Sequence, residues 1–291
     1  MPITSLRESK CLVTGAASGI GRAVAIAAAS EGAALFLTDI DAAALDRVAD
    51  QIRAAGGDVR MVRAFDISDA ASVERFAHDV HAAHGSVDVI MNIAGIAIWG
   101  SITALGDEHW RRCIEVNLMG PIHVLRCFVP SMIEAKRGGQ IVNVSSAAGL
   151  FGLPWHAAYS ASKFGLRGVS EVLRFDLRRY RIGVTLVCPG AVDTGLVRTV
   201  QIVGIDTTTP EVVKMRSRFQ KHAISPEKAA AQILDGALKN RYMVLTSPDV
   251  WLGWWGQRLF AWPYELVMRF LNNQLYAIAR RQRKPAPETT P

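Results

Sequence analysis

The sequence has little cysteine, and none of it has the spacing of a metal or redox motif. Its four cysteines (Cys11, Cys113, Cys127 and Cys188) stand far apart, without a C-x-x-C pair. This spacing excludes a zinc ribbon or a small disulfide framework and favours buried free thiols in a reducing compartment. The N-terminal MPITSLRESK lacks the apolar run of a secretory signal. We therefore expect a cytoplasmic protein.

A strong charge of one sign is also missing. The formal net charge is +7, and the arginine surplus is concentrated in residues 251–291, beside several tryptophans. We therefore expect no nucleic-acid partner, because nucleic acids bind a basic surface and the surplus here is confined to the tryptophan-rich C-terminal segment. His78, His81 and His84 are spaced i, i+3, i+6, which spreads them around a helix, so no metal site is predicted. Half of the residues are hydrophobic, which indicates a globular chain.

A glycine-rich turn near the N-terminus lies between an apolar strand and an alanine-rich helix. The strand at 11–13 leads into TGAASGIG, Thr14 to Gly21, and a second strand ends at Asp39. In this arrangement backbone N–H groups at the helix N-terminus reach a phosphate, and the acid accepts hydrogen bonds from a ribose. Because a carboxylate repels a 2′-phosphate, the pattern predicts NAD rather than NADP.

Further predicted cofactor contacts follow later strands, where ligands bind in an open parallel sheet. Asp66 ends a strand at 59–65, NIAG begins at Asn92, and PGAVDT begins at Pro189. The residues predicted to contact the cofactor are Gly15, Ser18, Gly19, Ile20, Gly21, Asp39, Asp66, Ile67, Asn92, Ala94, Gly95, Tyr159, Lys163, Pro189, Gly190, Val192 and Thr194.

The candidate catalytic residues are Asn117, Ser146, Tyr159 and Lys163. Tyr159 and Lys163 are four apart on a predicted helix and therefore share one face. A nearby ammonium lowers the pKa of a phenol, which then exchanges protons near neutral pH. Ser146 follows a strand and is placed to hold a substrate oxygen. Asn117 lies in a helix predicted at 103–129, interrupted near Gly120-Pro121, and is either a satisfied polar residue or the anchor of a water beside Lys163.

Taken together, these motifs resemble the short-chain dehydrogenase/reductase family, in its single-domain TGxxxGxG and YxxxK subgroup. The matching stretches are TGAASGIG, NIAG, YSASK at 159–163 and PGAVDT, over about residues 8–248. The resemblance implies a doubly wound, Rossmann-type parallel sheet in one α/β domain and hydride transfer to or from a nicotinamide. It also implies that Tyr159 is the general acid/base and Lys163 its partner, which also binds the ribose. Homodimers or homotetramers through helices at 103–129 and 155–178 are implied too.

The chain departs from this family pattern after residue 248. We divide it into a catalytic domain (1–248), an amphipathic, tryptophan-rich helical extension (249–284) and a disordered tail (285–291). The extension has Val267, Leu271, Leu275 and Ile278 near helical spacing, with arginines between them. It either packs on the domain or on another subunit, or makes a peripheral membrane contact through residues 250–284.

The substrate is predicted from loop residues that carry no charge: Trp99, Phe151, Leu153, Trp155, Leu196 and Val197. They favour a lipophilic secondary alcohol or ketone, such as a steroid, a retinoid-like compound or a fatty chain, with a mobile lid at 196–225. Two alternatives stay open. One is an NADP-dependent ketone or 3-oxoacyl reductase, which stays open because the basic Arg22 lies just after the glycine turn. The other is a catalytically silent, membrane-associated binding protein of the same fold.

Overall fold

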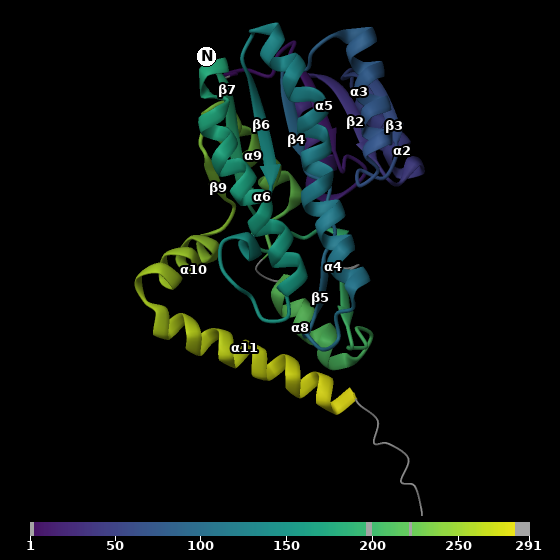
Figure 1. The fold of residues 1–291 in the computed structure, drawn as a ribbon. Helices are drawn as coiled ribbons and strands as arrows, with labels where there is room; N and C mark the ends of the chain where they lie inside the picture. Colours follow the sequence, from purple (N-terminus) through teal and green to yellow (C-terminus); the bar gives the residue numbers. More distant parts are fainter. Residues whose placement is uncertain (1–2, 196–199, 221–222, 283–291) are drawn as a thin grey trace, which may run out of the picture.

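A seven-stranded parallel sheet forms the centre of the molecule (Figure 1). The computed structural model describes residues 3–195, 200–220 and 223–282. The strand order is β3-β2-β1-β4-β6-β7-β9. The strands are β1 (Lys10–Thr14), β2 (Ala34–Asp39), β3 (Asp58–Ala64), β4 (Val89–Asn92), β6 (Gly139–Val144), β7 (Ile182–Cys188) and β9 (Met243–Leu245).

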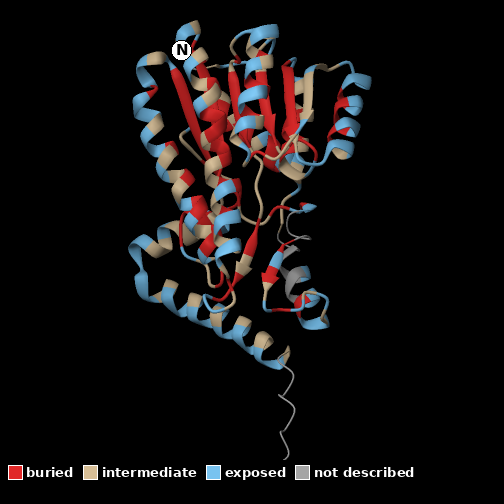
Figure 2. Ribbon diagram, turned by 45° about the vertical axis from the view of Figure 1, so that its right-hand side comes forward, coloured by how far each residue is buried: buried red, intermediate tan, exposed pale blue. Residues whose placement is uncertain are grey.

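Helices cover both faces of this sheet. One face packs against α1 (Gly19–Ser30), α2 (Ala42–Ala54) and α9 (Pro226–Leu238). The other packs against α3 (Ala70–His84), α5 (Gly120–Ala135) and α6 (Ala157–Asp176). The central strands are therefore buried along almost their whole length, as Figure 2 shows, and their sequences are continuous apolar runs. The predicted doubly wound sheet in a single domain is confirmed.

Local signals place the helix starts. Asp41 and Asp69 accept hydrogen bonds from the N–H groups of Ala44 and Ala71, which cap α2 and α3. Ser225 caps α9 in the same way, at the N–H of Lys228.

The helix predicted at 103–129 has different bounds and a different irregularity. It begins as α4 (Asp107–Ile114), passes through a π-helical turn at Glu115–Met119, and continues as α5 through Pro130 to Ala135. The irregular turn therefore precedes Gly120-Pro121. Pro121 has no N–H, so the carbonyl four residues earlier, that of Asn117, lacks its regular α-helical donor. The continuous segment 107–135 is long and apolar enough to cross a bilayer, but half of its most apolar stretch is buried, as in a core helix.

The segment predicted as a lid carries regular structure in its described part. β8 (Gln201–Val203) pairs in parallel with β5 (Ile98–Gly100), a short strand that the sequence did not indicate. Helix α8 (Pro210–Gln220) follows. Residues 196–199 and 221–222 of the predicted lid lie outside the described residues.

Two further helices, α10 (Pro248–Leu259) and α11 (Ala261–Gln282), run across one end of the domain, and we call them the C-terminal arm (Figure 1). The predicted apolar stripe is split between two environments. Leu275 and Ile278 pack against the domain, whereas Val267 and Leu271 are exposed. The reason is that α11 meets the domain on the side of Tyr264, Met268 and Leu275. The predicted tail at 285–291 lies outside the described residues.

Candidate active site

The turn between β1 and α1 can be built only with glycine. Gly15 has φ +72°, and a Cβ there would lie 2.8 Å from the backbone of Ala94. A Cβ on Gly21 would lie only 1.9 Å from the carbonyl oxygen of Gly15. Gly19, at φ +52°, faces Thr194, whose methyl carbon would be 3.1 Å from a Cβ. The turn therefore brings the helix start against the strand end and against the 189–194 loop, without side chains between them.

The N-terminus of α1 is open toward this space. Ser18 occupies the N-cap position but makes no side-chain capping bond among the described residues, and the first turn carries no acid. Its N–H groups and the positive end of the helix dipole are therefore available to an anion. Asp39, at the end of β2, accepts hydrogen bonds from the N–H groups of Ala17 (2.9 Å) and Asp41 (3.1 Å), which fix its carboxylate beside the turn.

A threonine links the two motifs that were predicted to contact the cofactor. The Thr14 hydroxyl oxygen accepts from the N–H groups of Ile93 (3.0 Å) and Ala94 (3.1 Å). The side chain of Asn92, the first residue of NIAG, is absent from the described cavity lining, so its contact with the cofactor stays a prediction. It is buried and donates to Asn143 Oδ1 at 2.9 Å, which ties β4 to β6.

Helix α6 and the end of β6 bring the catalytic candidates together. Tyr159 and Lys163 are buried on one face of α6, and Lys163 Nζ lies 5.9 Å from the centre of the Tyr159 ring. Val144 is the last residue of β6, and its carbonyl accepts a hydrogen bond from Lys163 Nζ at 3.0 Å. Ser146 follows two residues later, and its hydroxyl is hydrogen-bonded to the Tyr159 phenol. The phenol, the ammonium and the hydroxyl thus converge at one strand end.

Burial controls the proton affinities at this point. Burial raises the pKa of Tyr159 to about 12, and the hydrogen bond with Ser146 acts in the opposite direction. Burial also lowers the pKa of Lys163 to about 8. The phenol pKa thus lies above its usual range, contrary to the expectation that Lys163 would lower it. Each group is shifted toward its neutral form, because removing water penalises charge.

Asn117 supports the site from behind and does not line the cavity. Its amide accepts from the N–H of Ile96 (2.8 Å) and donates to the Ile96 carbonyl (3.0 Å) and to Ser162 Oγ (3.1 Å). Its oxygen lies close to Gly95, where a Cβ would be 3.0 Å from it and 3.3 Å from Lys163 Nζ. The side chain is therefore a satisfied polar group that positions the backbone after β4, and its role toward a water stays a prediction.

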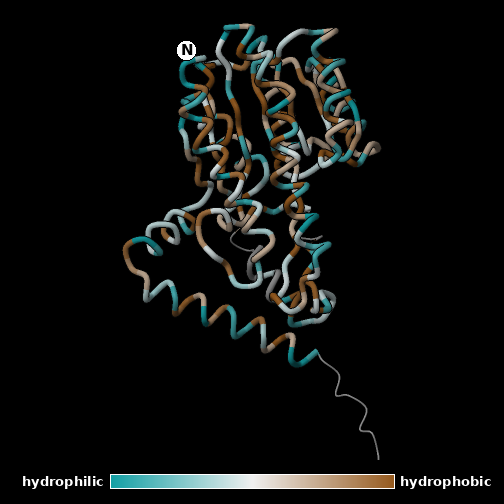
Figure 3. Tube along the Cα trace, viewed as in Figure 1, coloured by the Kyte–Doolittle hydropathy of each residue, from teal (hydrophilic) through white to brown (hydrophobic). Residues whose placement is uncertain are grey.

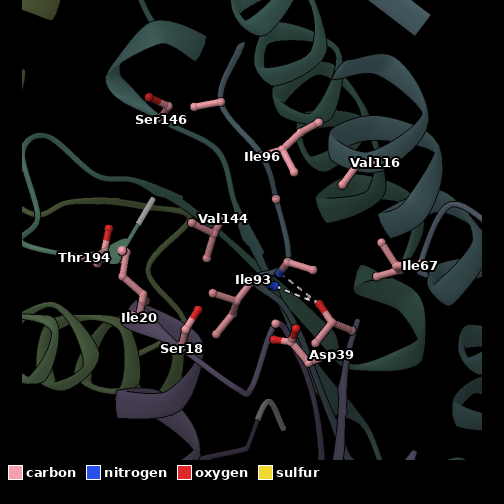
Figure 4. A pocket seen from close by; sticks show the side chains of 18 of the residues that line it. Ser18, Ile20, Asp39, Ile67, Ile93, Ile96, Val116, Val144, Ser146 and Thr194 are labelled. Atoms are coloured by element: carbon pink, nitrogen blue, oxygen red, sulfur yellow. Dashed lines mark hydrogen bonds between the residues drawn. The ribbon is translucent and has the colours of Figure 1, made fainter. Parts of the chain in front are cut away.

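One cavity of about 660 Å³ joins these parts. Figure 4 shows Asp39 and Ser146 at opposite ends of the side chains that line it. Apart from Asn92 and Asn117, every residue predicted for cofactor or catalysis lies in its wall. The sequence reading missed these lining residues: Thr14, Thr38, Ile40, Phe65, Ile93, Ile96, Ala97, Ile98, Arg112, Val116, Val144, Ser145, Gly195 and Gln201. Most of them flank a recognised motif at a strand end, and that position is the signal that could have found them.

None of the described residues predicted for the substrate wall is part of the described lining of this cavity. Trp99 stacks on His156 at 4.2 Å between ring centres. Phe151 and Trp155 pack against Tyr264 and Tyr276 of the C-terminal arm. Leu196 and Val197 lie outside the described residues. The exposed Arg112 of α4 and Gln201 of β8 line the cavity, and neither was among the residues predicted for the substrate wall. Both side chains come from elements that meet the sheet end only in the folded chain.

The histidines and cysteines have structural contacts. His81 shares a hydrogen bond with Ser131 (2.9 Å), and His84 packs edge-on against Phe36. The four cysteines are free thiols, three of them buried and Cys127 half-buried.

Comparison with known proteins decides the family. The model of the short-chain dehydrogenases matches residues 9–202. This chain belongs to the short-chain dehydrogenase/reductase family. It is 34% identical over 256 residues to a CLA biosynthesis dehydrogenase/reductase of Lactiplantibacillus plantarum, covering 84% of this chain and 89% of the relative. Its fold is similar to that of a short-chain dehydrogenase/reductase from Burkholderia phymatum in complex with NAD, with a TM-score of 0.77, 27% identity and 99% of each chain covered.

A second solved structure has the other nicotinamide cofactor. It is a metagenomic short-chain oxidoreductase in complex with NADP, with a TM-score of 0.67 and 35% identity, covering 82% of this chain and 97% of that one. As a short-chain dehydrogenase/reductase, the present protein is an oxidoreductase that uses a nicotinamide cofactor. The site fits such a cofactor, because Gly15, Gly19 and Gly21 leave space where side chains would clash and the α1 N-terminus is open to a pyrophosphate.

Proposed function

We propose that this protein transfers a hydride between NAD and a lipophilic secondary alcohol or ketone. The observation that carries the proposal is the single cavity with Asp39 at one end and Ser146, Tyr159 and Lys163 in the same wall. A dinucleotide bound along the α1 N-terminus spans that length, with its adenosine ribose at Asp39. Its nicotinamide end then faces the phenol.

The charges around Asp39 support NAD. A carboxylate fixed by two N–H groups is placed to accept from ribose hydroxyls and repels a 2′-phosphate. Arg22, the residue that kept NADP open, donates to Gln51 Oε1 of α2 at 2.9 Å and is not part of the described lining. The cations of the described lining are Lys163 and Arg112.

The protein contributes positioning and proton transfer. When bound, the cofactor supplies or accepts the hydride. In reduction, Tyr159 donates its proton to the carbonyl oxygen, which Ser146 holds by a hydrogen bond. In oxidation the phenolate accepts the alcohol proton, and Lys163 Nζ stabilises that negative charge. Because the phenol is protonated at neutral pH, reduction needs no prior deprotonation of Tyr159.

The substrate class is inferred from the rest of the lining. Ile96, Ala97 and Ile98 follow the NIAG motif and border the cavity with apolar atoms, as does Val144 beside Ser146. Such a wall binds steroid, retinoid-like or fatty-chain compounds better than sugars, which need many hydrogen-bonding groups. Arg112 and Gln201 add polar contacts for one substituent of the substrate.

The first test is a fluorescence titration with NADH and NADPH, on the wild type and on Asp39→Asn. The wild type is expected to bind NADH more tightly than NADPH. Asp39→Asn should lose most of that preference, because it removes the negative charge that repels a 2′-phosphate. Its amide oxygen can still accept from the N–H of Ala17. Equal or tighter binding of NADPH by the wild type would favour the alternative, an NADP-dependent ketone or 3-oxoacyl reductase. Binding of neither cofactor would favour the silent binding protein.

Assembly and location belong to the same proposal. Phe164, Val172 and Phe175 of α6 are exposed, and a homodimer or homotetramer through α5 and α6 would cover them. We place the protein in the cytoplasm, where its free thiols stay reduced. Light scattering of purified protein tests the assembly, and a monomer at micromolar concentration would contradict it.

A further inference from the structure

The C-terminal arm has an apolar outer side. None of the 22 residues of α11, all of them described, is buried. Trp262, Leu266 and Phe270 are spaced i, i+4, i+8 and expose 70%, 54% and 62% of their surfaces. Helix α10 repeats this spacing with Trp251, Trp255 and Leu259, which are exposed too. The outer side of α11 thus carries a continuous apolar stripe, and Figure 3 shows hydrophobic segments recurring along this helix.

The inner side of the arm is held on the domain. Tyr264 donates its hydroxyl to the carbonyl of Gly152 at 2.6 Å. Further along α11, Tyr276 packs edge-on against Trp155 at 5.3 Å between ring centres. Gln282, at the end of α11, accepts from the N–H of Asp206 at 2.8 Å and donates to Thr209 Oγ1 at 2.9 Å. The apolar outer side is therefore presented by a helix whose other side already has its contacts.

The charge on the arm is positive. The arm, residues 248–282, contains Arg258, Arg269, Arg280 and Arg281 against two acids, Asp249 and Glu265. Arg269 pairs with Glu265 through one helical turn, and Arg258 lies over the Trp254 ring at 4.5 Å. Arg280 and Arg281 are exposed at the end of α11. Tryptophan and other apolar side chains beside arginines match the boundary between acyl chains and anionic headgroups.

We propose that the C-terminal arm docks on the surface of a lipid bilayer that contains anionic lipid. The arm lies in the interface plane, with Trp262, Leu266 and Phe270 among the acyl chains and the arginines at the headgroups. A second copy of the chain fits this surface less well, because α11 offers its arginines no free acid in return: its one acid, Glu265, is already paired with Arg269.

Docking brings the loop between β6 and α6, which lies on the inner side of the arm, close to the lipid. Gly152 and Trp155, which the arm contacts, belong to the loop between β6 and α6 that leads to Tyr159. A lipophilic substrate then reaches the site from the bilayer, a consequence that rests on the proposed function, whereas the docking itself does not.

Vesicle flotation of the full chain tests the docking. Vesicles of phosphatidylcholine mixed with phosphatidylglycerol are expected to carry the protein upward, and vesicles of phosphatidylcholine alone to carry much less. Leu266→Ser with Phe270→Ser is expected to lower binding at least about tenfold, because it removes the stripe from exposed positions. The matched control, Ile102→Ser with Val213→Ser, removes two exposed apolar side chains outside the arm and should bind like the wild type. Arg280→Gln with Arg281→Gln should reduce the preference for anionic vesicles.

Three results would overturn the docking: no flotation of the wild type, equal loss in the control variant, or a stripe variant that floats normally. Light scattering distinguishes docking on lipid from binding of a second copy of the chain. If the stripe variant changes from dimer to monomer and neither protein floats, the arm binds a second copy. NADH binding, measured on the same samples, reports the proposed function independently and shows that each variant is folded.

Discussion

Burial favours the neutral forms of Tyr159 and Lys163, so the phenol donates a proton more readily than it accepts one. Both side chains are almost fully buried, and burial raises the pKa of the phenol to about 12 while it lowers that of the ammonium to about 8. A buried phenol keeps its proton near neutral pH, which suits proton donation to a carbonyl oxygen. In the oxidation direction Tyr159 must be a phenolate before it can accept a proton. Positive charge near the ring, from Lys163 or from bound ligands, favours the phenolate because it lowers the pKa of the phenol.

Tyr159→Phe tests the role of the phenol. The ring can still pack edge-on against His156, so the protein should fold and bind NADH as before. We expect kcat to fall at least about a hundredfold, because the proton donor is missing. Stopped-flow or steady-state assays on a ketone substrate measure kcat, and fluorescence titration measures NADH binding. A variant with undiminished kcat would remove Tyr159 from the mechanism.

Helix α1 is the element on which cofactor binding depends. Its start is pressed against the carbonyl of Gly15, its uncapped N–H groups face the cavity, and its inner side contributes Ala23, Val24 and Ala28 to the core. The same short turn therefore serves folding and phosphate binding, and a change there affects both. Gly168 of α6 lacks this constraint, because a Cβ there would meet nothing within 4 Å.

Gly21→Ala and Gly168→Ala form a matched pair in two helices. The added methyl group at position 21 would lie 1.9 Å from the Gly15 carbonyl oxygen, whereas at position 168 it meets nothing within 4 Å. We expect Gly21→Ala to abolish NADH binding and to lower the melting temperature. Gly168→Ala should bind NADH normally and gain about 0.5–1 kcal/mol in stability, because alanine loses less backbone freedom than glycine. Thermal unfolding with and without NADH measures both, and normal binding by Gly21→Ala would contradict the assignment of the turn.

At the scale of the whole molecule, the site costs folding free energy. Burial lowers the pKa of Lys163 from its ordinary value of 10.5 to about 8 in the fold. Between these values the unfolded chain binds more protons, so the contribution of Lys163 to stability rises with pH from 8 to 10.5 and is lowest below pH 8. His156 behaves alike at acid pH, since burial lowers its pKa to about 4 and stability falls as the pH drops below 6.5.

A pH series on wild type and Lys163→Met isolates this cost. The difference in free energy of unfolding, wild type minus variant, should increase by up to about 3 kcal/mol between pH 7 and pH 10, because only the wild type is relieved of a buried charge. Urea unfolding of the ligand-free proteins at each pH gives the difference, in which other titrating groups cancel. A difference independent of pH would mean that Lys163 keeps an ordinary pKa in the fold.

The sequence alone determined the order of the strands and helices, apart from β5, β8 and α8, and more than half of the lining of the cavity. Short continuous apolar runs bounded by turn residues indicate strands covered on both faces, and glycines followed by a helix and an acid leave few other arrangements. Tyr159 and Lys163 were predictable because their distance depends on helix geometry alone. Local rules of this kind hold before the chain folds.

Tertiary structure decided what depends on distant packing. The buried position of Asn92, the link from Asn117 to Ile96, and the presence of Arg112 in the cavity wall follow from neighbours far away in the sequence. The pKa of Tyr159 rises because the surrounding fold removes its water, which no spacing in the sequence reveals. The packing of Phe151 and Trp155 against the C-terminal arm was likewise decided by tertiary structure, because Tyr264 and Tyr276 are distant in the sequence.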